Sequence, residues 1–231
     1  MYYFFSNFYS YLIFILPALI LSLYAQAKVK GTYAKYGKKY NQKGLTGAMT
    51  ARMILDENGL QHVRIEHISG NLTDHFDPTT NVVRLSDSVY NSSSVAAVGV
   101  AAHECGHAVQ YAQSYTPMKI RGAIIPITNF GSTISIPLFF LGLIFFIPFL
   151  TTLGIVLFAL VAVFQLVTLP VEFNASNRAL KTLESSMYLS HEELGGAKKV
   201  LSAAAMTYVA ALIMSIAQLL RLIFIARRND R

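Results

Sequence analysis

The sequence predicts an α+β protein that is also a polytopic α-helical membrane protein, with about four spans and one small domain of helices and short strands. Three observations support this prediction. Hydrophobic residues make up 54% of the 231-residue chain and charged residues only 13%, about half the charged share of soluble domains. Three stretches contain no Asp, Glu, Lys, Arg or His, namely 1–27, 122–171 and 200–220. Most charges lie between these stretches, where short β-branched segments favour strands.

The uncharged stretches are long enough to cross a bilayer, which takes roughly 20 apolar helical residues. We therefore expect an N-terminal transmembrane anchor at 1–27, two transmembrane helices within 122–171 with a turn at Pro148, and a hydrophobic helix followed by a basic tail at 200–231. A cleaved signal peptide is the alternative for the first segment. No Lys or Arg precedes its apolar run, although a signal peptide usually begins with basic residues.

Basic residues directly follow the first span. They are Lys28, Lys30, Lys35, Lys38, Lys39 and Lys43. Positive charge beside a span favours the cytoplasmic side, so we expect a multi-pass membrane protein with its N-terminus outside and residues 28–121 on the cytoplasmic side. Contact of these flanks with lipid headgroups explains the net charge of +7 without a nucleic-acid partner. The basic C-terminal tail would then lie outside, unless 204–226 is a packed or re-entrant helix, and the sequence leaves both alternatives open.

Residues 28–121 predict a small domain with a short helix at 46–58 and a longer helix at about 93–114. Strands are expected at 63–66 and 81–85, separated by turn residues. The longer helix contains the pentad His103-Glu104-Cys105-Gly106-His107 directly after an uncharged run.

The pentad predicts a zinc site. Histidines four residues apart on a helix project from one face, one turn apart, and imidazoles in this arrangement can bind one Zn²⁺. Glu104 is placed to accept a proton from a water on the metal. Cys105 lies about 200° around the helix from His103, so we expect a small core residue rather than a ligand. A catalytic zinc takes three protein ligands and keeps one open position.

The third ligand has to come from another part of the chain. Glu172 is the first candidate, because it follows directly after the uncharged stretch 122–171. The run His191-Glu192-Glu193 is the rival, but Ser190 and Glu193 have the spacing of a capping box at a helix start. The acidic residues near Pro78 are better explained by a turn. The residues alone leave these alternatives open.

Several motifs resemble the YugP family of bacterial membrane-embedded neutral zinc metallopeptidases. They are Asp74-His75-Phe76-Asp77-Pro78, Val83-Arg84-Leu85-Ser86, Ala101-Ala102-His103-Glu104-Cys105-Gly106-His107-Ala108-Val109-Gln110 and Leu169-Pro170-Val171-Glu172-Phe173. More distantly, the layout is similar to HtpX-type peptidases and the CAAX prenyl proteases. The resemblance implies a zincin-like metallopeptidase domain with His103, His107 and Glu172 as zinc ligands and Glu104 as general base.

The chain departs from the family pattern next to the third ligand. Asn174 stands where relatives usually have Asp, and Ser176 where the more distant peptidases have Asp. If a carboxylate there orients a ligand imidazole, Asn174 and Ser176 would do so less strongly. In such peptidases an edge strand aligns the substrate backbone, and 81–85 is the candidate for this strand.

The sequence thus divides into five segments. They are an N-terminal anchor (1–27), a zincin-like domain (28–121), two spans (122–171), a helix that carries the third ligand (172–199) and a C-terminal helix with a basic tail (200–231). We expect a zinc endopeptidase with one Zn²⁺ per chain that acts on peptides or membrane proteins. The resemblance suggests membrane-protein quality control as its role, and further membrane proteins are candidate partners. The alternative is a scaffold that keeps zinc for structure. That would need a fourth protein ligand, and no extra His or Cys lies near either motif.

Overall fold

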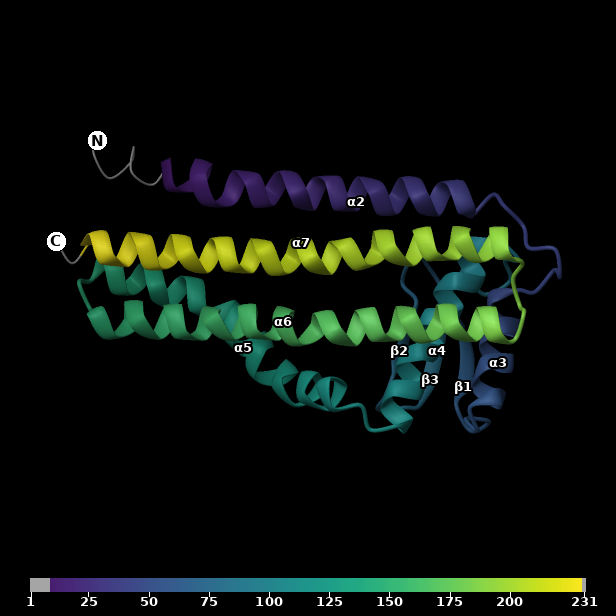
Figure 1. Cartoon of the computed structure of the whole chain (residues 1–231). Helices are drawn as coiled ribbons and strands as arrows, with labels where there is room; N and C mark the ends of the chain where they lie inside the picture. Colours follow the sequence, from purple (N-terminus) through teal and green to yellow (C-terminus); the bar gives the residue numbers. More distant parts are fainter. Residues whose placement is uncertain (1–8, 230–231) are drawn as a thin grey trace. The chain divides into compact units, whose positions relative to one another are not determined.

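The structure is a computed structural model that describes residues 9–229. These residues form two compact units, and Figure 1 shows the order of their elements. Of the described residues, the first unit draws on 9–26, Ile120–Leu169 and 207–229. The second draws on Ala27–Lys119 and Pro170–Met206.

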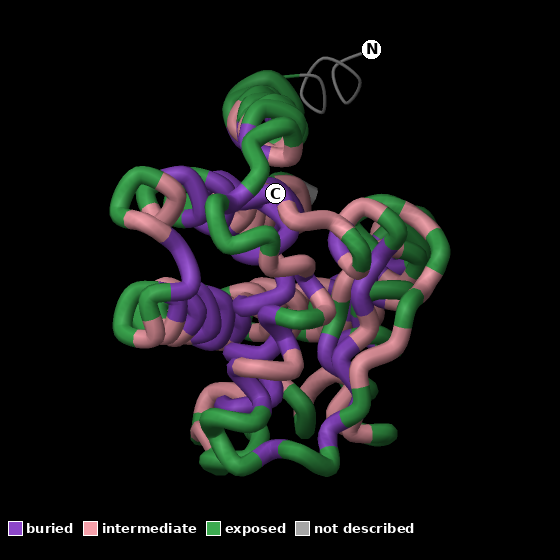
Figure 2. The backbone as a smooth tube through the Cα atoms, turned by 90° about the vertical axis from the view of Figure 1, so that its right-hand side faces the viewer, coloured by how far each residue is buried: buried purple, intermediate pink, exposed green. Residues whose placement is uncertain are grey.

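The four predicted spans are present as helices that are long and apolar enough to cross a membrane. They are the π-helical turn η1 (Tyr11–Ile15) continued by α2 (Leu16–Tyr36), α5 (Thr116–Ile144), α6 (Pro148–Ser185) and α7 (His191–Asn229). Most of the described residues before position 28 are exposed on the isolated chain (Figure 2). Large exposed apolar surface of this kind is expected where lipid covers a helix.

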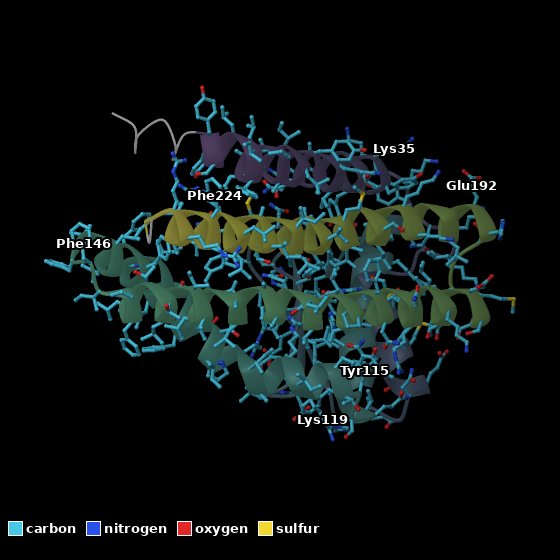
Figure 3. The ribbon with its side chains drawn as sticks, turned by 60° about the vertical axis from the view of Figure 1, so that its left-hand side comes forward. Lys35, Tyr115, Lys119, Phe146, Glu192 and Phe224 are labelled. Atoms are coloured by element: carbon cyan, nitrogen blue, oxygen red, sulfur yellow. The ribbon has the colours of Figure 1, made fainter. Side chains whose placement is uncertain are left out.

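The predicted turn at Pro148 is confirmed. α5 ends at Ile144 and α6 begins at Pro148, the helix position where proline needs no backbone N–H donor. Phe146 in the turn has a positive φ of 54° and lies at the end of the helix pair (Figure 3). α5 and α6 approach closely, since a β-carbon at Gly154 would come 2.7 Å from the carbonyl oxygen of Ser135.

The last two helices are longer than the sequence predicts. α6 runs without a break through position 172, and α7 runs without a break through position 199, although the sequence places segment boundaries at these two positions. α7 is one continuous helix through 204–226, and the side of the membrane on which its basic end lies stays a prediction. Arg221 on this helix is only 9% exposed, and its guanidinium lies 4.6 Å from the centre of the Tyr11 ring. A charged side chain on an apolar, membrane-spanning helix is costly, and this cation–π contact with the Tyr11 ring partly stabilises the Arg221 charge.

The second unit contains the predicted short helix and the pentad helix. α3 (Gly47–Glu57) begins where the Thr46 hydroxyl accepts from the amide of Met49, and α4 (Val95–Ala112) begins where the Ser94 hydroxyl accepts from the amide of Ala97. These hydroxyls satisfy amides that have no partner within the helix. α4 is buried along most of its length, and it packs against α3 and the sheet.

The sheet has the order β1-β3-β2, with β1 (Arg64–Ile68) parallel and β2 (His75–Asp77) antiparallel to β3 (Val82–Ser86). The strands predicted at 63–66 and 81–85 are therefore confirmed to within two residues. The prediction of 81–85 as an edge strand is wrong, because β3 is the central strand. The sequence predicts only a turn near Pro78, and it does not predict the strand β2 that precedes this turn. The turn begins at Asp77, whose carboxylate accepts hydrogen bonds from the amides of Thr79 and Thr80.

Candidate metal centre

Helix α4 brings His103 and His107 to one face. Their ring centres lie 4.7 Å apart, as expected for side chains one helical turn apart. His107 is 9% exposed, so this face of the helix is turned towards protein. The other side of the pentad packs against α3, because the Cys105 thiol is fully buried and lies 3.5 Å from the carbonyl oxygen of Ala51. The predicted core role of Cys105 is confirmed.

Glu172 on α6 meets the two histidines. One of its carboxylate oxygens, Oε2, lies 3.3 Å from His103 Nε2 and 3.5 Å from His107 Nε2. Two donors bound to a tetrahedral zinc at 2.0–2.1 Å would lie about 3.3–3.4 Å apart. Within residues 9–229, His103, His107 and Glu172 form the only group of three metal-binding side chains (His, Cys, Asp or Glu) whose donor atoms are close enough to share one ion. The donor set and its spacing therefore fit a zinc ion.

Glu104 lies beside the two histidines on α4 and is only 8% exposed. No hydrogen bond or ion pair of its carboxylate is found among the described residues, while its charge acts on the neighbouring His107 imidazole. A carboxylate beside a metal site that is not engaged in an ion pair can accept a proton from a reacting water.

The outer ring nitrogens of both histidines are occupied. The Ser176 hydroxyl lies 3.1 Å from His103 Nδ1, and the Gln110 side-chain oxygen lies 3.0 Å from His107 Nδ1. In each ring Nε2 therefore remains for the metal. The structure places Ser176 directly against a candidate ligand, whereas Asn174 reaches His107 only through Gln110.

Gln110 is not among the site residues predicted from the sequence. A signal was present, since a glutamine three residues after His107 lies on the same face of an apolar helix. A buried amide there needs partners, and the ligand imidazole is the polar group one turn back on the same face of the helix.

The rival acidic residues have structural partners. Glu193 accepts from the amides of Ser190 and Gln42, at 2.8 and 2.7 Å, so the predicted capping box is confirmed. Glu192 lies 3.6 Å from Lys39. Asp74 accepts from both the amide and the hydroxyl of Ser86. None of these carboxylates belongs to the cluster of three formed by the described residues.

The electrostatics of the centre favour positive charge. Burial lowers the pKa of His107, but the hydrogen bond that its protonated ring donates to Glu172 and the nearby charge of Glu104 outweigh this effect, so the pKa lies above its ordinary value of 6.5. An environment that stabilises a cation on an imidazole also stabilises a bound metal cation.

The sequence signature of the family described as "Putative neutral zinc metallopeptidase" matches residues 11–227. The chain belongs to this family. Among curated sequences, it is similar to the "Putative membrane protease YugP" of Bacillus subtilis (strain 168), with 49% identity over 210 residues, 91% of this chain and 93% of the relative. No solved structure matches the chain. Family membership and the relative agree with the resemblance seen in the sequence motifs, and the family description implies zinc.

Proposed function

We propose that the chain is a zinc-dependent endopeptidase embedded in the bacterial cytoplasmic membrane. The observation that carries this proposal is the convergence of His103, His107 and Glu172 beside a buried Glu104. Four helices that could cross a membrane and the membrane protease relative support the location.

The proposed chemistry assigns one task to each side chain. His103 and His107 bind zinc through Nε2, and Glu172 completes the ligand set with its carboxylate. Bound zinc would polarise the scissile carbonyl and lower the pKa of a water ligand. Glu104 accepts the proton of the attacking water and passes it to the leaving amine nitrogen as the peptide bond breaks.

The geometry of the sheet supports a place for the substrate. β2 pairs with β3 on one side only, and no other described strand pairs with its second edge. β2 contacts α4, and Phe76 on this strand packs against Tyr111 with ring centres 5.9 Å apart. Tyr111 is one turn beyond His107. We propose that an extended substrate segment adds to β2 by backbone hydrogen bonding.

The lysines after the first span support a cytoplasmic active site, because positive flanks favour that side. Peptides or membrane proteins are the proposed substrates, and clearance of damaged membrane proteins is the proposed role. A non-catalytic zinc scaffold is the second candidate. It is disfavoured because the described cluster has three donors and not four, while structural zinc sites are usually closed by four protein ligands.

A Glu104→Gln substitution tests the proposal. The detergent-purified full chain is incubated with a peptide library, and cleavage products are identified by mass spectrometry. The variant should keep its zinc and lose hydrolysis by about 100-fold or more, the usual contribution of a general base. Glu192→Gln, at an exposed carboxylate, is the matched control and should cleave at the wild-type rate. Wild-type cleavage by Glu104→Gln would overturn the mechanism, and a zinc-loaded wild type that cleaves nothing would favour the scaffold.

A further inference from the structure

Gln110 is fully buried on α4 and uses both ends of its amide group. Its oxygen Oε1 lies 3.0 Å from His107 Nδ1. Its nitrogen Nε2 lies 2.8 Å from the backbone oxygen of Val171 and 2.9 Å from Oδ1 of Asn174. The side chain thus connects a candidate zinc ligand on α4 with the backbone directly before Glu172 on α6.

The partners determine which way the Gln110 amide points. The backbone oxygen of Val171 can only accept a hydrogen bond. Asn174 Oδ1 also receives a hydrogen bond from Nε of Arg178, at 2.7 Å. Because arginine only donates, the Asn174 atom that faces both Arg178 and Gln110 has to be its oxygen. Two acceptors therefore face the NH₂ group of Gln110, and its oxygen faces His107.

The orientation of Gln110 in turn determines the proton position on His107. An amide oxygen only accepts, so His107 Nδ1 has to carry the proton. In a neutral imidazole Nε2 then has a free lone pair, and Nε2 is the atom that faces Glu172. The opposite tautomer would place an N–H towards the metal and leave two acceptors facing each other at Gln110.

We propose that Gln110 is a positioning residue that fixes His107 in its metal-binding tautomer, and that Asn174 and Arg178 hold Gln110 in the orientation this requires. The inference rests on the zinc site of the proposed function. The other ligand differs, because the Ser176 hydroxyl near His103 can either donate or accept and does not select a tautomer by itself. Asn174 therefore acts through Gln110, and its two accepted hydrogen bonds do not require a charge.

Zinc affinity of the full chain, measured by competition with a chelator, tests the proposal. Gln110→Met has a similar shape but cannot accept from His107, and it should bind zinc about 10–100-fold more weakly, the usual effect of losing such a contact. Gln61→Met, at an exposed glutamine outside the network, is the matched control and should bind as the wild type. Asn174→Asp should stay within about threefold of wild type, whereas Asn174→Leu should lose about tenfold. Wild-type affinity in Gln110→Met would overturn the proposal.

A spectroscopic signature separates positioning from a general structural role. The metal-free chain carrying Glu172→Leu is labelled with ¹⁵N-histidine, because without zinc the Glu172 carboxylate next to His107 Nε2 would itself attract a proton to that atom. The ring nitrogens are observed by NMR at alkaline pH, where the imidazoles are neutral. In this background His107 should carry its proton on Nδ1, and the addition of Gln110→Met should give a mixture of tautomers for that ring alone. A His107 with its proton on Nε2 in the Glu172→Leu chain would overturn the proposal even if the Gln110 variant does not fold. Wild type that binds no zinc would refute the proposed function instead, and the tautomer measurement on metal-free protein would still decide the role of Gln110.

Discussion

Gly106 lies directly against the backbone of Ala175 where α4 meets α6. A β-carbon at position 106 would come 2.7 Å from the carbonyl oxygen of Ala175, a distance that side-chain carbons do not adopt. The glycine of the pentad therefore allows the close helix contact that brings Glu172 to His103 and His107.

A Gly106→Ala substitution should separate the two helices and weaken the metal centre. We expect the free energy of unfolding to fall by about 1–3 kcal/mol, the usual effect of overpacking, and zinc affinity to fall with it. Thermal unfolding and chelator competition measure the two effects. Gly195→Ala on α7 is the matched control, because a β-carbon at that position would have no neighbouring atom within 4 Å. This control should be neutral or stabilising by about 0.5–1 kcal/mol, and equal stability of the two variants would contradict the account.

Cys105 should be chemically silent in the folded protein although it lies between the two histidines in sequence. Its thiol is fully buried against α3, and burial raises its pKa far above the ordinary range. The thiolate is the reactive form, so a maleimide reagent should label the denatured chain but not the native one. Cys105→Ala should retain its zinc. Rapid labelling of the native protein, or loss of zinc in the variant, would mean that Cys105 faces the metal.

Zinc binding should weaken as the pH falls, and the effect should begin near neutrality. The pKa of His107 is raised above its ordinary value of 6.5, so protons compete with zinc at higher pH than they would at an ordinary histidine. The charge of Glu104 is one cause of the increase. In Glu104→Gln the pH midpoint of zinc binding should therefore move downward, with Glu192→Gln unchanged. An unchanged or higher midpoint in Glu104→Gln would contradict this electrostatic account.

The spans and the pentad could be predicted from sequence because each depends on local properties. The absence of charge over a span length identifies helices such as α5 and α6, and the four-residue spacing of His103 and His107 is a property of one helix. Pro148 and the capping box at Ser190 are likewise local signals, and the structure confirms both.

Features that depend on tertiary contacts could not be predicted from the residues alone. β2 is short, and the residues Asp77 and Pro78 at its end are typical of a turn. Only the pairing with β3 makes this segment a strand, and that pairing cannot be read from the local sequence. Position alone does not select Glu172 over Glu193, because the approach of α6 to α4 depends on the contact at Gly106. The spacing of Gln110 from His107 is a local signal, but its bridging role could not be predicted because its other partners, Val171 and Asn174, lie on α6, more than 60 residues away in sequence.

The zinc content of the purified full chain tests the central claim most directly. Wild type, His103→Ala and Glu172→Ala are purified in detergent, and zinc is measured per chain by mass spectrometry, with Glu192→Ala as control. We predict one zinc in wild type and in the control, and a loss or sharp weakening of zinc binding in both of the other variants. Zinc retained by Glu172→Ala would contradict the proposed ligand set, and a wild type that binds no zinc after reconstitution would contradict the metallopeptidase itself.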